Sequence, residues 1–508
     1  MAISPYATPF SAGSLAARRS GDLFVGMRRE LDELQRRLAT GQRSETFGGL
    51  GLERRTSLDF RGRLAMLDGY LATVKDAQFR IGLMTDGLSR LDALAGTTKS
   101  ELSPPKFDPG ADGRTTVQKS VEERLKLAID VLNTEINGRH IFAGRASDRP
   151  PVLDAKTILD GDGLRIGLRA MIPERVTADR AGDGLGHATL ASASAAGVES
   201  LSISTADAAR LGLKIVGLAE NMTNVALPGT ANAAGVTAAA GTTTAQLDFT
   251  GLPAAGEGFQ IQVQLPDGTL ASLSFTAVAP PGSGQPGTFV IGADAAATRT
   301  NALNAIQASI TALMQGDDAK TASSIAAARE FFGQTAANPL PAGAYSQPVV
   351  QWYAGDDDLA SIPNGRDTAP VRVDESTVIG TGARANEAPI RNVLANLGVL
   401  AAESFSNTGP ERLRYEALAD KVRRNLSPAD PAERIDSMVS DLGSATAAMN
   451  AAKERHQATG AVVRDMLTRN EEASPEEVAA SILALQTRLQ ASYQTTSILA
   501  RLSIVNYL

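Results

Sequence analysis

The sequence of 508 residues contains no cysteine, three histidines and few aromatic residues, which make up 4% of the chain. The absence of cysteine excludes a disulfide scaffold, a thiolate zinc site and a cysteine nucleophile. His140, His187 and His456 lie far apart in the sequence, so a histidine-rich metal site has few possible ligands. The low aromatic content argues against an aromatic-lined substrate pocket and leaves Ala, Leu, Val and Ile to supply most of the burial.

Long apolar runs and an excess of positive charge are also missing. No segment approaches the ~20 consecutive apolar residues that span a bilayer, so we expect a soluble chain without membrane insertion. In the first 25 residues the only basic residues are Arg18 and Arg19, and no apolar run follows a basic start. We therefore expect no cleavable secretory signal. The net charge of −7 makes a nucleic-acid partner unexpected.

Sequence motifs for catalysis are absent or weak. No G-x-S-x-G, H-E-x-x-H or phosphate-binding loop occurs. Residues Gly282 to Gly287 fit G-x-G-x-x-G, but a strand-like run follows where a dinucleotide site needs a helix, which predicts a plain loop. Asp356, Asp357 and Asp358 lack EF-hand spacing and predict a solvated acidic turn. We interpret His456 as a surface residue and His140 as packed or interfacial, and we expect no enzymatic activity, no cofactor and no metal site.

Helical patterns dominate both ends of the chain. Between Asp22 and Ala39 apolar residues recur at alternating steps of three and four, which is heptad spacing, and Thr40-Gly41 ends the pattern. A longer helix follows with Leu64, Leu67, Leu71, Val74, Ile81 and Leu88 on one stripe. A third is expected from Thr116 to Ile136, with Asn137-Gly138 as its C-cap.

The C-terminal helices are expected at 390–402, 409–426 and 432–470. The last helix has Ser474 at its N-cap, Pro475 at the first helical position and Glu477 two positions later, a capping box. From Glu476 to Leu508 there is no Gly or Pro, and the apolar stripe is interrupted by Ser492, Thr496 and Ser503.

The middle of the chain, roughly 150–390, is rich in Gly, Ala, Ser, Thr and Pro. Phe259 to Leu265 and Leu270 to Val278 alternate around Pro266-Asp267-Gly268, which predicts a β-hairpin. A third strand at 288–291 and a helix at about 296–314 complete an inserted α/β module. Further strands are expected at 349–353 and 371–379.

The expected fold is mainly α with a β-containing central region, in which the N- and C-terminal helices pair as a coiled-coil rod and central α/β or β domains face outward. We expect four parts: 1–45 with 471–508 as terminal coiled-coil helices, 46–150 with 387–470 as a helical rod, 151–224 with 316–386 as a β-containing domain, and 225–315 as an inserted module. The polar interruptions leave the terminal stripe incompletely satisfied in one copy. The expected assembly interface consists of Phe24, Met27, Leu31, Leu34, Leu38, Val478, Ile482, Leu485, Leu489, Leu499, Leu502 and Val505.

Three stretches resemble the bacterial flagellin superfamily. They are LQRRLATGQR at 34–43, LNTEINGRHIFAGR at 132–145, and ILALQTRLQASYQTTSILARLSIVNYL at 482–508. Within the superfamily, Trp352 to Asp356, Arg372 to Glu375 and Gly382 to Glu387 are similar to segments of hook-filament junction proteins. The stretch Ser44 to Gly49 departs from the family pattern, in which many relatives carry an Asn and paired Asp. The first 20 residues carry two prolines in place of an early helix.

The resemblance implies a structural subunit that self-assembles into a ring or helical polymer and joins the flagellar hook to the filament. It further implies export through the flagellar type III apparatus with an export chaperone, an extracellular location in the flagellum, and a hook-side junction protein and flagellin as partners. Two alternatives remain: a filament flagellin, and a secreted protein whose module at 225–315 binds a surface or a glycan.

Overall fold

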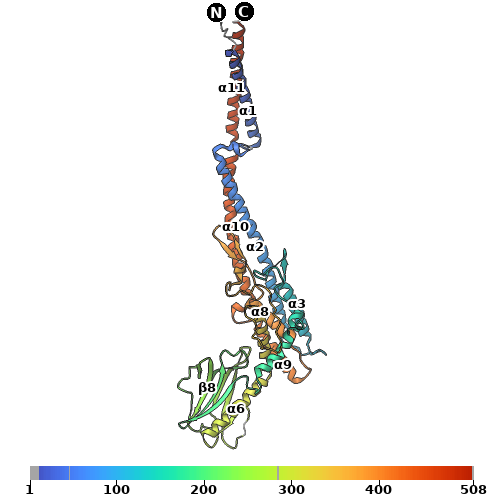
Figure 1. Ribbon diagram of the computed structural model, residues 1–508, viewed down its shortest axis with the longest axis vertical. Coiled ribbons are helices and arrows are strands. Elements are labelled where there is room, and N and C mark those ends of the chain that lie inside the picture. Colours follow the sequence, from blue (N-terminus) through green and yellow to red (C-terminus); the bar gives the residue numbers. More distant parts are fainter. Residues whose placement is uncertain (1–10, 45, 283–284, 506–508) are drawn as a thin grey trace, which may run out of the picture. The chain divides into compact units, whose positions relative to one another are not determined.

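The computed structural model describes residues 11–44, 46–282 and 285–505; the side chains of 11–20, 47 and 499–505 lie outside this description. The fold is mixed, with long helices and several β-sheets (Figure 1). The α-helices are α1 Ser11–Thr40, α2 Arg54–Glu101, α3 Thr116–Leu132, α4 Ala155–Asp160, α5 Leu168–Arg180, α6 Ala295–Gln315, α7 Asp317–Gly333, α8 Ala388–Ala402, α9 Gly409–Asn425, α10 Ile435–Glu471 and α11 Pro475–Val505. The 3-10 helices are η1 Phe47–Glu53, η2 Gly365–Thr368 and η3 Pro431–Glu433.

The chain divides into two compact units. Unit 1 comprises Met1–Asp76, Arg372–Thr377 and Met449–Leu508, and unit 2 comprises Ala77–Val371 and Val378–Ala448. Unit 1 therefore contains α1, α11 and the adjoining parts of α2 and α10. Helix α1 begins at Ser11, so an early helix does precede residue 20, contrary to the sequence-based interpretation.

The last helix begins where its sequence predicts. The backbone N–H of Glu477 donates to the Ser474 side-chain oxygen at 3.3 Å, which satisfies one of the free N–H groups of the first turn. The Ser474 hydroxyl donates to Glu476 at 2.9 Å. Pro475 occupies the first helical position, where its missing N–H costs nothing.

The third helix ends earlier than its sequence suggests. Helix α3 stops at Leu132, and two short strands, β1 Glu135–Ile136 and β2 Arg139–His140, pair antiparallel. Asn137 and Gly138 have φ of 52° and 76°, the left-handed geometry of a two-residue hairpin turn. The Asn-Gly pair is thus a hairpin turn and not a helix C-cap, because both motifs place the same residue types at positive φ.

Helix α8 lies in the core of the helical part of unit 2. It contacts α3, α7 and α9, and twelve of its fifteen residues are buried. This burial on most sides explains why the 388–402 sequence is largely apolar, with Arg391, Asn392 and Asn396 as its polar side chains.

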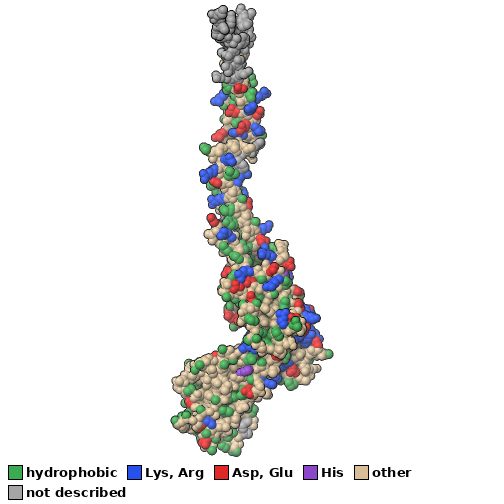
Figure 2. Space-filling model, in the orientation of Figure 1, with side chains coloured by type: hydrophobic (Ala, Val, Ile, Leu, Met, Phe, Trp, Pro, Cys, Tyr) green, Lys and Arg blue, Asp and Glu red, His purple; other side chains and the backbone are tan. Residues whose placement is uncertain are grey.

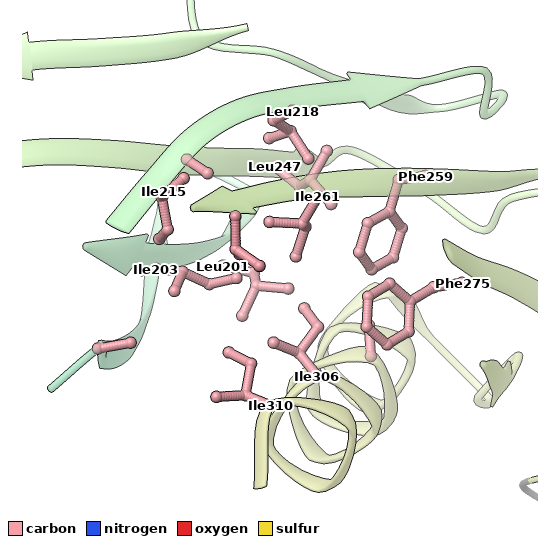
Figure 3. Close-up of a cluster of buried hydrophobic side chains, with 14 of the residues drawn as sticks. Leu201, Ile203, Ile215, Leu218, Leu247, Phe259, Ile261, Phe275, Ile306 and Ile310 are labelled. Atoms are coloured by element: carbon pink, nitrogen blue, oxygen red, sulfur yellow. The ribbon is translucent and has the colours of Figure 1, made fainter. Parts of the chain in front are cut away.

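Strands β3 to β11 form a module with one continuous core. They are β3 Thr189–Ala195, β4 Val198–Ala206, β5 Lys214–Glu220, β6 Val225–Ala226, β7 Val236–Ala239, β8 Thr242–Phe249, β9 Gly258–Gln264, β10 Leu270–Val278 and β11 Thr288–Val290. Two further strands, β12 Pro370–Arg372 and β13 Val378–Gly380, lie outside this core. Strands β3-β4-β8-β6 form one sheet, with β7 also on β8, and β11-β10-β9-β5 form another. Figure 3 shows side chains from both sheets meeting Ile306 and Ile310 of α6.

The predicted hairpin at 259–278 corresponds to β9 and β10, which pair antiparallel, and the predicted third strand and helix correspond to β11 and α6. The module's core, however, runs from Leu185 to Ala322. A boundary at 225 would separate β4 from its partner β8 and β5 from its partner β9. The sequence boundary was misplaced because the Ser- and Ala-rich strands before 225 have weak hydrophobic alternation.

Two further strand predictions have different outcomes. Residues 371–379 contain most of β12 and the start of β13, which pair with each other in a two-stranded sheet. Within the described residues, 349–353 forms no strand, only isolated bridges at Val349 and Tyr353.

Candidate assembly surface

Helices α1 and α11 contact each other within unit 1. At one end the N–H of Ala473 donates to the carbonyl of Gly41, and the N–H of Arg43 donates to the carbonyl of Glu471, at 2.9 and 2.8 Å. Further along, the rings of Phe24 and Tyr493 stack with centroids 4.9 Å apart. The residue order of these contacts makes the two helices antiparallel, and Figure 1 shows them side by side.

Most of the predicted stripe faces inward. Val478 and Leu485 are buried, and Ile482, Leu489 and Ser492 are half-buried on the same side of α11. On α1, four of the five predicted residues are half-buried: Phe24, Met27, Leu31 and Leu34. The side chains of Leu499, Leu502 and Val505 lie outside the described residues.

Leu38 is the exception, since 46% of it is exposed while its neighbour Arg37 is half-buried. A straight α-helix drifts by ~20° per heptad from a strict seven-residue repeat. Leu38 lies two heptads after Phe24, so it has rotated by about 40° away from the contact. The heptad pattern alone does not reveal this drift. Leu38 stays a predicted residue of the assembly interface, but it lies outside the α1–α11 contact.

One of the polar residues that interrupt the stripe, Thr496, donates its hydroxyl to the carbonyl of Ser492 at 2.8 Å. This hydroxyl therefore needs no polar partner from another helix. The side chain of Ser503 lies outside the described residues.

Unit 1 exposes an unusual share of large apolar side chains. Eleven of the nineteen exposed large hydrophobic residues in the described part of the chain belong to it, although it spans only about a quarter of the sequence. Figure 2 shows green side chains among red and blue ones on the visible face of α1 and α11. The eleven are Leu23, Val25, Leu38, Leu52, Leu58, Met66, Val462, Met466, Leu483, Tyr493 and Ile498.

The segment between α1 and α2 is held by charged contacts. Arg43 pairs with Glu53, and Arg61 pairs with Glu471 at 2.7 Å. The hydrogen bond from Arg61 lowers the pKa of the Glu471 carboxyl, and Ser57 adds to this effect. Leu52, in η1, is 99% exposed. Spacing in the sequence does not reveal the Arg61–Glu471 pair, because its partners lie 410 residues apart.

The acidic turn at Asp356 to Asp358 belongs to unit 2 and is not simply solvated. Arg145 donates to both carboxylate oxygens of Asp356, at 2.9 and 3.1 Å, and to Asp358 at 3.0 Å. Asp356 is 8% exposed, and the Arg145 hydrogen bond is the largest influence in lowering its pKa. Within the described residues no cluster of His, Asp and Glu is arranged to hold a metal ion.

The same contact joins three segments of unit 2 that are distant in the sequence: 132–145, 352–356 and 382–387. The carbonyl of Ala143 accepts from the N–H of Asp356, and the carbonyl of Phe142 accepts from the N–H of Ala385. Arg384 is fully buried and donates to the carbonyls of Ile362 and Pro363. These hydrogen bonds hold the three segments against one another within unit 2.

His456 is buried, contrary to its interpretation as a surface residue. It is 4% exposed, stacks on Tyr70 with ring centroids 5.4 Å apart, and its Nε2 lies 2.6 Å from the carbonyl of Val373. The sequence around His456 is charged, but the segment 372–377 covers the ring. His140 is half-buried, with Nδ1 2.9 Å from the carbonyl of Asn133.

In the described part of the chain, none of the helices has the length and apolar character needed to cross a bilayer. Comparison of the sequence with models of protein families and with curated proteins finds no match.

Proposed function

We propose that this chain is a structural subunit of the bacterial flagellum that self-assembles through its terminal helices and joins hook to filament. The observation that carries the proposal is the antiparallel contact of α1 with α11 combined with the exposed apolar residues around it. Two helices bury only the sides that face each other, so apolar residues elsewhere on their surfaces stay in water until another chain covers them.

The proposed arrangement is a coiled-coil pair of α1 and α11 that packs against the same pair in neighbouring copies. Leu23 and Val25 on α1 and Leu483 on α11 lie outside the α1–α11 contact and are 50–64% exposed. They are the side chains that a neighbouring copy would cover. The partners in this proposal are other copies of the chain, a hook-side junction protein and flagellin, reached through the type III export apparatus with a chaperone.

Paired substitutions test whether the outer surface drives assembly. Leu485→Asp places a carboxylate at a position that is 4% exposed, so it should break the α1–α11 contact and assembly together. Leu483→Asp changes a residue that is 64% exposed, so it should preserve helix content but block assembly. Leu164→Asp, at a residue of unit 2 that is 83% exposed, is the matched control and should assemble normally. Normal polymers from Leu483→Asp would contradict the proposed surface.

Deletion of Ser474 to Leu508 should leave a soluble chain that no longer assembles. Electron microscopy of a strain lacking the protein separates the junction role from that of a filament flagellin. A bare hook that sheds filament supports the junction role, whereas a shortened or thinned filament supports the alternative. Reproducible glycan binding by the full chain, lost on changes in the β-module, would favour the second alternative.

A further inference from the structure

Strand β3 is an edge strand without the usual protection. It lies at the end of its sheet, and among the described strands it pairs with β4 alone, in an unbroken register from Thr189 opposite Ser204 to Ala195 opposite Val198. Its sequence, TLASASA, contains no charged residue, no proline and no glycine. Natural edge strands are commonly shielded by charges, prolines, bulges or short length, because an open edge is a template for another strand. None of these devices is present in β3.

The turn that follows β3 determines which backbone groups face outward. Ala196 and Gly197 have φ of 53° and 81°, a two-residue hairpin turn that is closed by Ala195 and Val198. In such a hairpin the closing residues exchange both hydrogen bonds, and every second pair from there does the same. The N–H and C=O groups of Leu190, Ser192 and Ser194 therefore point away from β4.

These outward groups are open to a partner. In the described part of the chain, no turn, loop or side-chain hydrogen bond reaches the main-chain groups of Leu190, Ser192 or Ser194. Every residue of β3 except Leu190 is exposed. The nearby charges, Arg299 and Glu199, already pair with each other, and Glu199 accepts from the Ser194 hydroxyl at 2.6 Å. These two charges therefore neutralise each other beside β3 and do not oppose the approach of an uncharged strand.

We propose that β3 pairs antiparallel with β3 of a second copy, centred on Ser192. The three outward residues are symmetric about this position, so Ser192 meets Ser192 of the other copy and Leu190 meets Ser194. Each copy then contributes three N–H donors and three C=O acceptors, and all of them find partners. The side chains are Ala, Ser and Thr apart from Leu190, so no large group obstructs the pairing. A self-complementary edge of this kind favours a second copy over an unrelated strand.

This pairing goes beyond the proposed assembly through the terminal helices. A two-fold axis reverses the direction of the second copy, so the contact cannot relate neighbours within a polar ring. It joins two unassembled chains or two separate assemblies. Loss of the β3–β3 pairing therefore leaves assembly through α1 and α11 unaffected. Each of the two proposals can fail while the other stands.

Single cysteines test the pairing in the full chain, because the sequence contains no other cysteine. In the proposed register, residues 192 of the two copies are directly opposite at a Cα separation of about 5.5 Å, within disulfide range. Residues 194 are offset by four residues, or roughly 13 Å, which exceeds that range. Under mild oxidation with oxidised glutathione, Ser192→Cys should give roughly tenfold more covalent dimer than Ser194→Cys.

Equal cross-linking of the two variants, or no dimer from Ser192→Cys, would overturn the proposal. A second measurement avoids the cysteine altogether. Ser192→Pro removes one outward N–H without touching the β3–β4 hydrogen bonds, so the folded chain should lose its dimer in sedimentation analysis. Ser192→Thr keeps this N–H group, so the variant should still form the dimer. Dimerisation of Ser192→Pro at the wild-type concentration would equally contradict the pairing.

Discussion

Phe24 of α1 stacks on Tyr493 of α11, with ring centroids 4.9 Å apart and an interplanar angle of 23°. Phe24 is half-buried by this contact, yet 63% of Tyr493 remains exposed. The tyrosine thus covers the phenylalanine on one side and meets water on the other. The same holds along α1 and α11: each helix buries one side of the other and leaves the remaining apolar side chains exposed to water.

Replacing Phe24 by Ala should loosen the α1–α11 contact. The stack and the half-buried ring together contribute about 1 kcal/mol, so the amide hydrogens of α1 should exchange roughly fivefold faster. Hydrogen exchange with mass spectrometry measures this directly. Leu23→Ala is the control, because 63% of Leu23 is exposed, and it should leave exchange unchanged. Equal effects of the two variants would show that the aromatic contact does not stabilise the helix pair.

Replacing Lys421 by Ala should strongly destabilise unit 2. The Lys421 ammonium lies 2.8 Å from the Asp267 carboxylate and 3.0 Å from the Thr269 hydroxyl, and both charged groups are buried. The variant leaves a buried carboxylate without its cation, which costs about 3–5 kcal/mol. Urea denaturation of the full chain measures the loss. The double variant Lys421→Met with Asp267→Leu removes both charges and should be more stable than Lys421→Ala alone.

The Asp356 contact should make unit 2 sensitive to acid. The hydrogen bonds from Arg145 hold the pKa of Asp356 below its ordinary value of 3.8. A folded pKa below the unfolded one means that the contact stabilises the fold fully above the unfolded pKa, and that this contribution is lost as the pH falls through the folded pKa. Urea midpoints measured from pH 6 to pH 2 should show this loss.

Arg145→Ala provides the comparison for that pH series. Without the guanidinium, the pKa of Asp356 should rise, so the variant should be less stable at pH 6, and the difference from wild type should shrink toward pH 2. Arg145→Lys keeps the charge but not the two parallel hydrogen bonds, and it should lie between them. A difference that stays constant over the whole range would assign the stabilisation to packing instead.

His456 should anchor the segment 372–377 within unit 1. Replacing it by Phe keeps the aromatic contact with Tyr70 but removes the hydrogen bond to the carbonyl of Val373, which should cost about 1 kcal/mol. His456→Ala loses both interactions and should cost about 2–3 kcal/mol. Hydrogen exchange of residues 372–377 reports the local effect. If the Ala variant protects this segment as well as wild type does, the histidine is not its anchor.

Local sequence signals were sufficient for several elements. Helix α11 begins where Ser474, Pro475 and Glu477 indicate, and strands β9 and β10 follow the alternation on either side of Pro266-Asp267-Gly268. These signals act over a few residues: capping, the helical period and turn geometry are properties of adjacent positions. The half-burial of Phe24, Met27, Leu31 and Leu34 also follows from their spacing.

Other features depended on residues that are distant in the sequence. Asn137-Gly138 fits both a helix C-cap and a hairpin turn, and the pairing of β1 with β2 decides between them. The Asp356 carboxylate is held by Arg145, and the His456 ring is covered by Val373, neither of which spacing can reveal. By itself the sequence determined where chain segments become helix or strand, because those preferences are local. Only the tertiary structure decided which polar groups are buried and paired, because that depends on which distant segments meet.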